Sequence, residues 1–152
     1  MKKFLSLVGL VGVIGLGAAA DAQVTGLAHV FSVPGVMQTG NGLATFVACT
    51  NGGTASATIG AEARDASGAV VGSQPSVTVA PGATTVFATN NAVGIAVDQN
   101  LNTGSFTKGH IRIYGSTTRG IICSAFLADY LNPLPTSMTN LSIVKKFSQK
   151  GQ

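Results

Sequence analysis

The sequence predicts an all-β fold, an antiparallel β-sandwich of seven or eight short strands preceded by a signal peptide. Short runs with apolar residues at every second position are typical of strands that bury one face. Clusters of Gly, Pro, Asn and Asp separate these runs, as turns between strands do. No helical repeat of apolar residues follows residue 22, which argues against a helix bundle or a mixed fold.

Residues 1–22 have the three parts of a secretory signal: the basic pair Lys2 and Lys3, an apolar run from Phe4 to Ala20, and the cleavage motif Ala20-Asp21-Ala22. We therefore expect secretion, to the periplasm or the extracellular space, and a mature chain that begins at Gln23. The alternative is an uncleaved membrane anchor, but four glycines make the apolar run a poor membrane span. No second run of spanning length follows, so we expect no transmembrane span after cleavage.

The remaining chain has the size of one domain, which we place at residues 23–147, followed by a basic tail at 148–152. The chain has a net charge of +4. Outside the signal, the excess positive charge lies in Lys145, Lys146 and Lys150, and the body of the domain is neutral. A nucleic-acid-binding face needs clustered cations and stacking aromatic side chains. This charge distribution argues against nucleic acid as a partner.

Six runs before residue 90 have the alternation or the composition of strands. The first is expected to end at Pro34-Gly35, and Pro75 is expected to separate two short strands at a sheet edge. The segment Asn90–Phe106 breaks the rhythm and is interpreted as a crossover or an exposed loop. The six runs are 24–33, 43–50, 57–65, 69–72, 76–80 and 83–89.

The central predicted strand is Arg119–Asp129, which is mostly apolar on both faces and therefore needs cover on both sides. It forms a predicted hairpin with the alternating run Lys108–Tyr114, whose Ile111 and Ile113 point inward. A last strand is expected within Met138–Phe147, after a connection whose prolines prevent continued pairing.

Cys49 and Cys123 lie in two predicted strands whose inner faces can oppose each other. In an exported protein an even number of cysteines indicates disulfides, and two cysteines allow only one pairing. Closing a loop of this length stabilises a fold by about 4 kcal/mol in the chain-entropy description. The alternative is a pair of buried free thiols, which pack well in cores.

Four features resemble, in their order, bacterial immunoglobulin-like or fibronectin-III-like domains. They are Cys49-Thr50-Asn51, the turn Asp65–Gly68, the run Val77–Thr89 around a Pro-Gly turn, and the late cysteine strand. The resemblance covers about Leu43–Asp129 and implies an immunoglobulin-like β-sandwich, although the core tryptophan of immunoglobulin domains is missing. The whole chain also resembles short exported bacterial proteins of unknown function, which imply no functional residues.

Motifs for catalysis are absent or isolated. The sequence has no G-x-S-x-G motif, and S-x-x-K occurs twice, at Ser105–Lys108 and Ser142–Lys145, without the helix that this motif needs. A carboxylate pair for glycoside hydrolysis would have to come from four acidic residues, three of them in turns or loops. We therefore predict no catalytic residues.

Metal ligands are also sparse. His29 and His110 are far apart in the sequence, and a site formed by both with Asp98 or Asp129 would depend on the fold bringing them together. The run Asp98–Asn102 offers oxygen ligands but lacks the acidic density of a calcium loop. We predict neither a metal site nor a cofactor.

Apolar surface is the remaining distinctive feature. Phe46, Ile122 and Phe126 point away from the cysteines, and either the first and last strands cover them or a partner does. The three lysines Lys145, Lys146 and Lys150 supply weak attraction to an anionic surface. We take these six side chains as candidate interaction residues, and we expect the Asn90–Phe106 segment to make contacts as well.

The predicted function is that of a secreted structural or protein-interaction module of the cell envelope or extracellular space, without catalysis. Its partner is expected to be a protein or a cell surface, and pairing through exposed strand edges makes a homo-oligomer plausible. The alternative is a small exported hydrolase or metal-dependent enzyme. The scarcity of His, Asp and Glu favours the module, because catalysis at neutral pH usually draws on those groups.

Mass spectrometry of the exported protein should find an N-terminus at Gln23, because the A-x-A motif places signal cleavage after Ala22. A cell-associated product that retains Met1 would contradict the prediction.

Overall fold

The computed structural model of the chain describes residues 24, 26–133, 135 and 137–145. These residues form eleven strands and no helix, so they contain no helix that could cross a membrane. Eleven is more than the expected seven or eight strands, and three of the eleven have only two residues each. The predicted signal peptide, Lys146, Lys150 and the predicted tail lie outside the described residues.

The strands are β1 (Ala28–Gln38), β2 (Leu43–Asn51), β3 (Ala57–Asp65), β4 (Val70–Val71), β5 (Ser76–Val79), β6 (Thr84–Ala88), β7 (Gln99–Asn100), β8 (Phe106–Gly115), β9 (Ile121–Asp129), β10 (Met138–Leu141) and β11 (Val144–Lys145).

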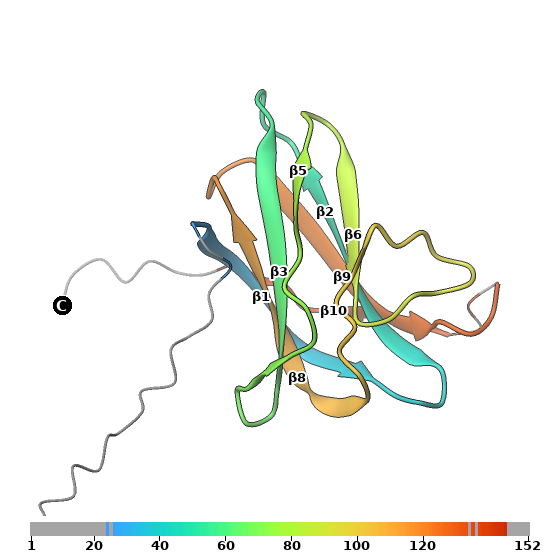
Figure 1. Cartoon of the computed structure of the whole chain (residues 1–152). Coiled ribbons are helices and arrows are strands. Elements are labelled where there is room, and N and C mark those ends of the chain that lie inside the picture. The colour runs from blue at the N-terminus through green and yellow to red at the C-terminus, as the bar shows by residue number, and fades with distance from the viewer. Residues whose placement is uncertain (1–23, 25, 134, 136, 146–152) are drawn as a thin grey trace, which may run out of the picture.

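The strands form two layers that face each other (Figure 1). One layer has the order β6-β2-β9-β10, and the other has β3, β8, β1 and β11 in that order, with β4 and β5 on the outer side of β3. A short pairing of Gln38 with Ala44 joins β1 to β2, so the layers are two halves of one folded sheet. The pairings are antiparallel except that of β6 with β7. The all-β, antiparallel prediction is confirmed.

The main core fills the space between the two layers. Strand alternation directs every second side chain of each long strand into this space, where it meets side chains of the opposite layer. Its largest fully buried members come from both layers and are Val33, Val36, Val47, Ile59, Phe87, Leu101, Ile111 and Ile113.

Strand β1 continues beyond the point where the sequence was expected to end it. Pro34 and Gly35 lie within the strand, and the register of its pairing with β8 shifts between Pro34 and Val36. Gly35 has a φ of 75°, a left-handed conformation that glycine adopts without strain. The prediction of a strand end was wrong because a β-bulge accommodates both residues and pairing then resumes.

The Cys49–Cys123 disulfide is present, and it joins neighbouring strands of the same layer. The two cysteines are direct partners in the antiparallel pairing of β2 with β9, with their Cα atoms 4.1 Å apart. The predicted pairing is confirmed, but the bond does not connect opposing inner faces. In immunoglobulin domains the disulfide links the two sheets, so this bond departs from that pattern.

A loop at residues 89–98 covers part of the outer face of the β2–β9 layer. Its apolar side chains pack on a second, smaller core that includes Phe46 and Phe126, whose rings stack with centroids 5.3 Å apart. Phe46 is fully buried, so it cannot contact a partner. The cover comes from this loop and not from the first or last strand. The loop side chains that make the contact are Ala92, Ile95 and Val97.

Replacing Phe46 with alanine should lower the free energy of unfolding by about 3–5 kcal/mol, because it empties a closed site beneath the loop. Ile122 is the matched control, since it points to the same side of the layer but is 65% exposed. Ile122→Ala should change the unfolding free energy by less than about 0.5 kcal/mol. Urea denaturation followed by circular dichroism measures both, and equal effects would show that the loop does not protect Phe46.

Candidate functional site

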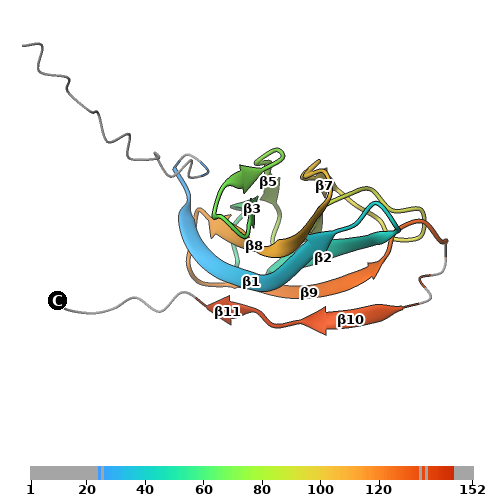
Figure 2. The ribbon, with the colours of Figure 1, turned by 90° about the horizontal axis from the view of Figure 1, so that it is seen from below.

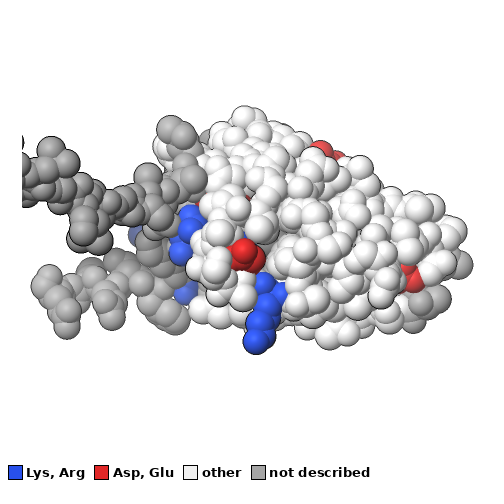
Figure 3. All heavy atoms as spheres, turned by 60° about the horizontal axis from the view of Figure 1, so that its bottom comes forward, with Lys and Arg blue, Asp and Glu red and all other residues white. Residues whose placement is uncertain are grey.

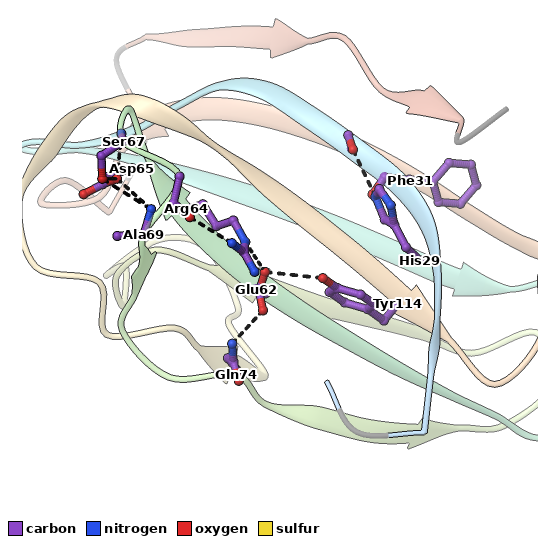
Figure 4. A network of polar contacts seen from close by, with 11 residues as sticks. His29, Phe31, Glu62, Arg64, Asp65, Ser67, Ala69, Gln74 and Tyr114 are labelled. Carbon is purple, nitrogen blue, oxygen red and sulfur yellow. Dashed lines mark hydrogen bonds and ion pairs between the residues drawn. The ribbon is translucent and has the colours of Figure 1, made fainter. Parts of the chain in front are cut away.

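Glu62 is the centre of a buried polar network on the outer face of the other layer (Figure 4). Its Oε1 accepts a hydrogen bond from Nε of Arg64 at 2.5 Å and one from the Tyr114 hydroxyl at 3.3 Å. Its Oε2 accepts one from Nε2 of Gln74 at 2.6 Å. Both carboxylate oxygens are therefore bonded, and the side chain is 0% exposed.

Strand register explains how these groups meet. Alternation along β3 turns Ile59 and Ala63 to the main core and Glu62 and Arg64 to the opposite face. The pairing of β3 with β8 places Arg112 opposite Glu62. Alternation along this run is enough to place Glu62 and Arg64 on the outer face, but it does not reveal that the two charged side chains are buried.

This arrangement supports the fold and leaves no room for a substrate. A carboxylate that water cannot reach and that accepts three hydrogen bonds holds its neighbours in place. Burial raises the pKa of Tyr114 above its usual value, which keeps the hydroxyl protonated and able to donate to Glu62. Arg64 extends the network to the turn after β3 by donating to the Gly68 carbonyl at 2.8 Å.

The structure does not assemble the metal site considered from the sequence. His29 lies on β1, where its Nε2 donates to the Phe31 carbonyl at 2.8 Å, and His110 lies on β8 opposite Pro34. Asp98 and Asp129 belong to the other layer, where each accepts a backbone N–H, from Val86 and Leu131 respectively. Among the described residues no three His, Cys, Asp or Glu side chains form a cluster that could hold a metal.

The two S-x-x-K matches lie in extended chain. The first runs from Ser105 into β8, and the second ends in β11. The run Asp98–Asn102 uses its oxygens locally, since Oδ1 of Asn100 accepts the N–H of Asn102 at 2.8 Å. None of these segments therefore presents the helix or the free ligand set that its motif requires.

At one end of the sandwich the 89–98 loop meets the connection after β9 (Figure 1), and large apolar side chains there are exposed. Val93, Leu131 and Met138 are 69%, 55% and 59% exposed. The Val93 N–H bonds to the Tyr130 carbonyl, Leu131 follows Tyr130 in the sequence, and Met138 pairs with Ala128. Tyr130 itself is half-buried against the second core. We call Val93, Leu131 and Met138 the apolar end.

Backbone contacts hold the apolar end in place. The N–H of Val93 donates to the Tyr130 carbonyl at 3.1 Å, and the N–H of Tyr130 donates to the Gly42 carbonyl at 2.7 Å. Gly94 fits closely against Pro133, because a Cβ at Gly94 would lie 2.0 Å from the Pro133 carbonyl oxygen. Met138 pairs with Ala128, whose side chain belongs to the second core. The exposed side chains therefore stand on a fixed frame.

Charged side chains are few on the part of the surface that one view of the molecule shows (Figure 3), and most of that part is uncharged. Asp129, close in sequence to Leu131, accepts the Leu131 N–H at 2.9 Å and also contacts the Asn132 side-chain amide. Exposed apolar clusters of this kind on otherwise polar proteins commonly mark contact surfaces.

The six residues taken as interaction candidates differ in position and in exposure. Phe46 is buried, Phe126 is half-buried beside it, and Ile122 is exposed near the start of β9, at the other end of that strand from Leu131. Lys145 is exposed on β11, and Lys146 and Lys150 lie outside the described residues. Reasoning from the sequence missed the apolar end, although single large apolar residues within turn-rich segments were a signal for it.

Comparisons with known proteins assign no family. No protein-family model matches the chain, and no curated protein sequence matches it. Among solved structures, FlgD from Xanthomonas campestris, described for hook capping in flagellar assembly, aligns over 79% of this chain and 70% of that chain, with 20% identity and a TM-score of 0.32. PfGH50B aligns over 82% of this chain but 19% of that chain, with 18% identity and a TM-score of 0.37. At these TM-scores neither likeness bears on function.

Glu62→Gln should lower the free energy of unfolding by about 3–5 kcal/mol, because it leaves the largely buried Arg64 without its carboxylate. Asp65→Asn is the matched control, since it removes a carboxylate from an exposed turn of the same strand and should have little effect. Chemical denaturation measures both. If the two variants unfold alike, the Glu62–Arg64 pair does not stabilise the fold.

Proposed function

We propose that the protein is a secreted structural or protein-interaction module of the immunoglobulin-like class, acting in the cell envelope or extracellular space. Its contact surface is the apolar end, and its partner is a protein that offers a complementary apolar surface. The two antiparallel layers of short strands support the class, and the disulfide within one layer is a departure from it.

The exposure of Val93, Leu131 and Met138 is the observation that carries this proposal. Burying a side chain such as Leu or Met completely is worth about 1.5–3 kcal/mol relative to leaving it in water. Because the backbone around these residues is already fixed, a partner would bind them with little loss of conformational entropy. A few well-placed side chains supply most of the affinity in a typical interface.

Secretion is supported by the disulfide, because such bonds persist in oxidising compartments. The exposed Lys145 on β11, together with the lysines that follow it in the sequence, supplies a weaker attraction to anionic surfaces. The polar network around Glu62 has a structural part in this proposal, since its hydrogen bonds are internal.

Leu131→Lys should weaken binding of the purified protein to cell-envelope fragments of its source by about tenfold or more, because it places a charge in an apolar contact. Ile122→Lys is the matched control, with a similar exposure at the other end of β9. Co-sedimentation over a range of protein concentrations measures both affinities. If Ile122→Lys weakens binding and Leu131→Lys does not, the outer face of β9 is the contact surface and the apolar end is not.

A further inference from the structure

One continuous segment, residues 138–145, closes the open side of the sandwich. Its first part, β10, pairs with β9 of one layer from Met138 to Leu141, and its second part, β11, pairs with β1 of the other layer at Val144 and Lys145. Figure 2 shows β10 and β11 lying in line along the same side of the molecule. We call residues 138–145 the closing segment.

The closing segment is attached by few apolar contacts. Leu141 and Ile143 are half-buried and pack against the main core, while its other six side chains are exposed. Local opening of such a segment costs much less than unfolding the whole domain. Opening would expose part of the core and leave the edges of β9 and β1 unpaired, and an unpaired edge is a template for another strand.

The connection between β9 and β10, residues 130–137, contains Pro133 and Pro135. To place β10 antiparallel to β9, the chain must reverse direction within this connection. Proline fixes φ and biases the preceding residue towards extended conformations, so two prolines reduce the number of ways in which the connection can reverse direction. The same two residues favour a straight path that would carry the closing segment away from its own domain.

We propose that the protein forms a dimer in which two copies exchange their closing segments. Each segment then pairs with β9 and β1 of the other copy and restores there every contact that it makes within one chain, so the exchange changes only the connection. The pairing seen within one chain is itself the evidence that this segment fits these two strand edges.

The position of the apolar end selects a second copy as the partner, and in this respect the inference rests on the proposed function. Leu131 and Met138 lie at the two ends of the 130–137 connection, and Val93 is held beside its first residue, Tyr130. In a two-fold symmetric exchanged dimer the two connections run past each other. Three of the five exposed large apolar side chains of the described residues would therefore come close to their counterparts.

Two single-cysteine variants test the exchange directly. Thr139 is the register partner of Leu127, so a mixture of Leu127→Cys and Thr139→Cys chains can form a paired disulfide only between two copies whose β10 and β9 pair across the dimer. The matched control is a mixture of Ala48→Cys and Ser124→Cys, which are register partners in β2 and β9, strands that do not exchange. Each mixture is incubated at high concentration, oxidised, and analysed for covalent heterodimer on a non-reducing gel, with peptide mapping of the disulfides.

The expected result is a heterodimer that accumulates in the first mixture and stays at the background level in the control. Replacing both Pro133 and Pro135 with alanine in that pair should lower its yield by about two- to fivefold per proline, since each proline restricts the connection. Light scattering of the unmodified protein should find a dimer whose fraction rises with concentration and falls on Leu131→Lys.

Three outcomes would overturn the exchange. A heterodimer yield equal to that of the control shows that the closing segment stays in its own chain. A dimer seen by light scattering that Leu131→Lys dissociates, without the Leu127–Thr139 cross-link, shows surface contact between copies without exchange, and the proposed contact role of the apolar end survives. If the protein stays monomeric and binds envelope fragments through Leu131, the apolar end takes a different protein: the proposed function stands and the exchange is wrong.

Discussion

The pairing of β2 with β9 is the constraint on which most of the structure depends. It places Cys49 opposite Cys123 and Phe46 opposite Phe126, so the disulfide and the aromatic stack both follow from one register. At the end of β2, the Asn51 side-chain amide donates to the carbonyls of Ala55 and Val79 at 2.8 and 2.9 Å, which ties this layer to the chain around β5 in the other. A slip of one residue would exchange the two faces of a strand and separate all of these contacts.

Much of the strand layout could be predicted from local pattern. The range Ala57–Asp65 was predicted with the bounds that β3 has, because clean alternation between two turns leaves little choice. The end of β1 was predicted too early, because whether a strand ends or bulges at Pro34 depends on the neighbouring β8. The position of the disulfide within one layer could not be derived either, since alternation indicates which way a side chain points and not which strand lies beside it.

The candidate sites were less predictable than the strands. Alternation placed Glu62 on the outer face of its layer, and burial there depends on Gln74 and Tyr114 arriving from other parts of the chain. Phe46 was taken as a contact residue because the loop that covers it has no strand pattern to reveal where it packs. The apolar end combines residues from two connections that are about forty positions apart in the printed sequence, and only the fold brings them together.

The order of the strands has a kinetic consequence. Strands β1 and β3 both pair with β8, and β2 pairs with β9, so the strands formed early in the sequence find their main partners more than forty residues later, as with Ala61 and Ile113. Folds dominated by such distant pairings form slowly, because the chain loses the conformational entropy of closing long loops before the stabilising contacts form. A chain threaded through a membrane pore from its N-terminus would therefore stay extended until β8 and β9 had passed.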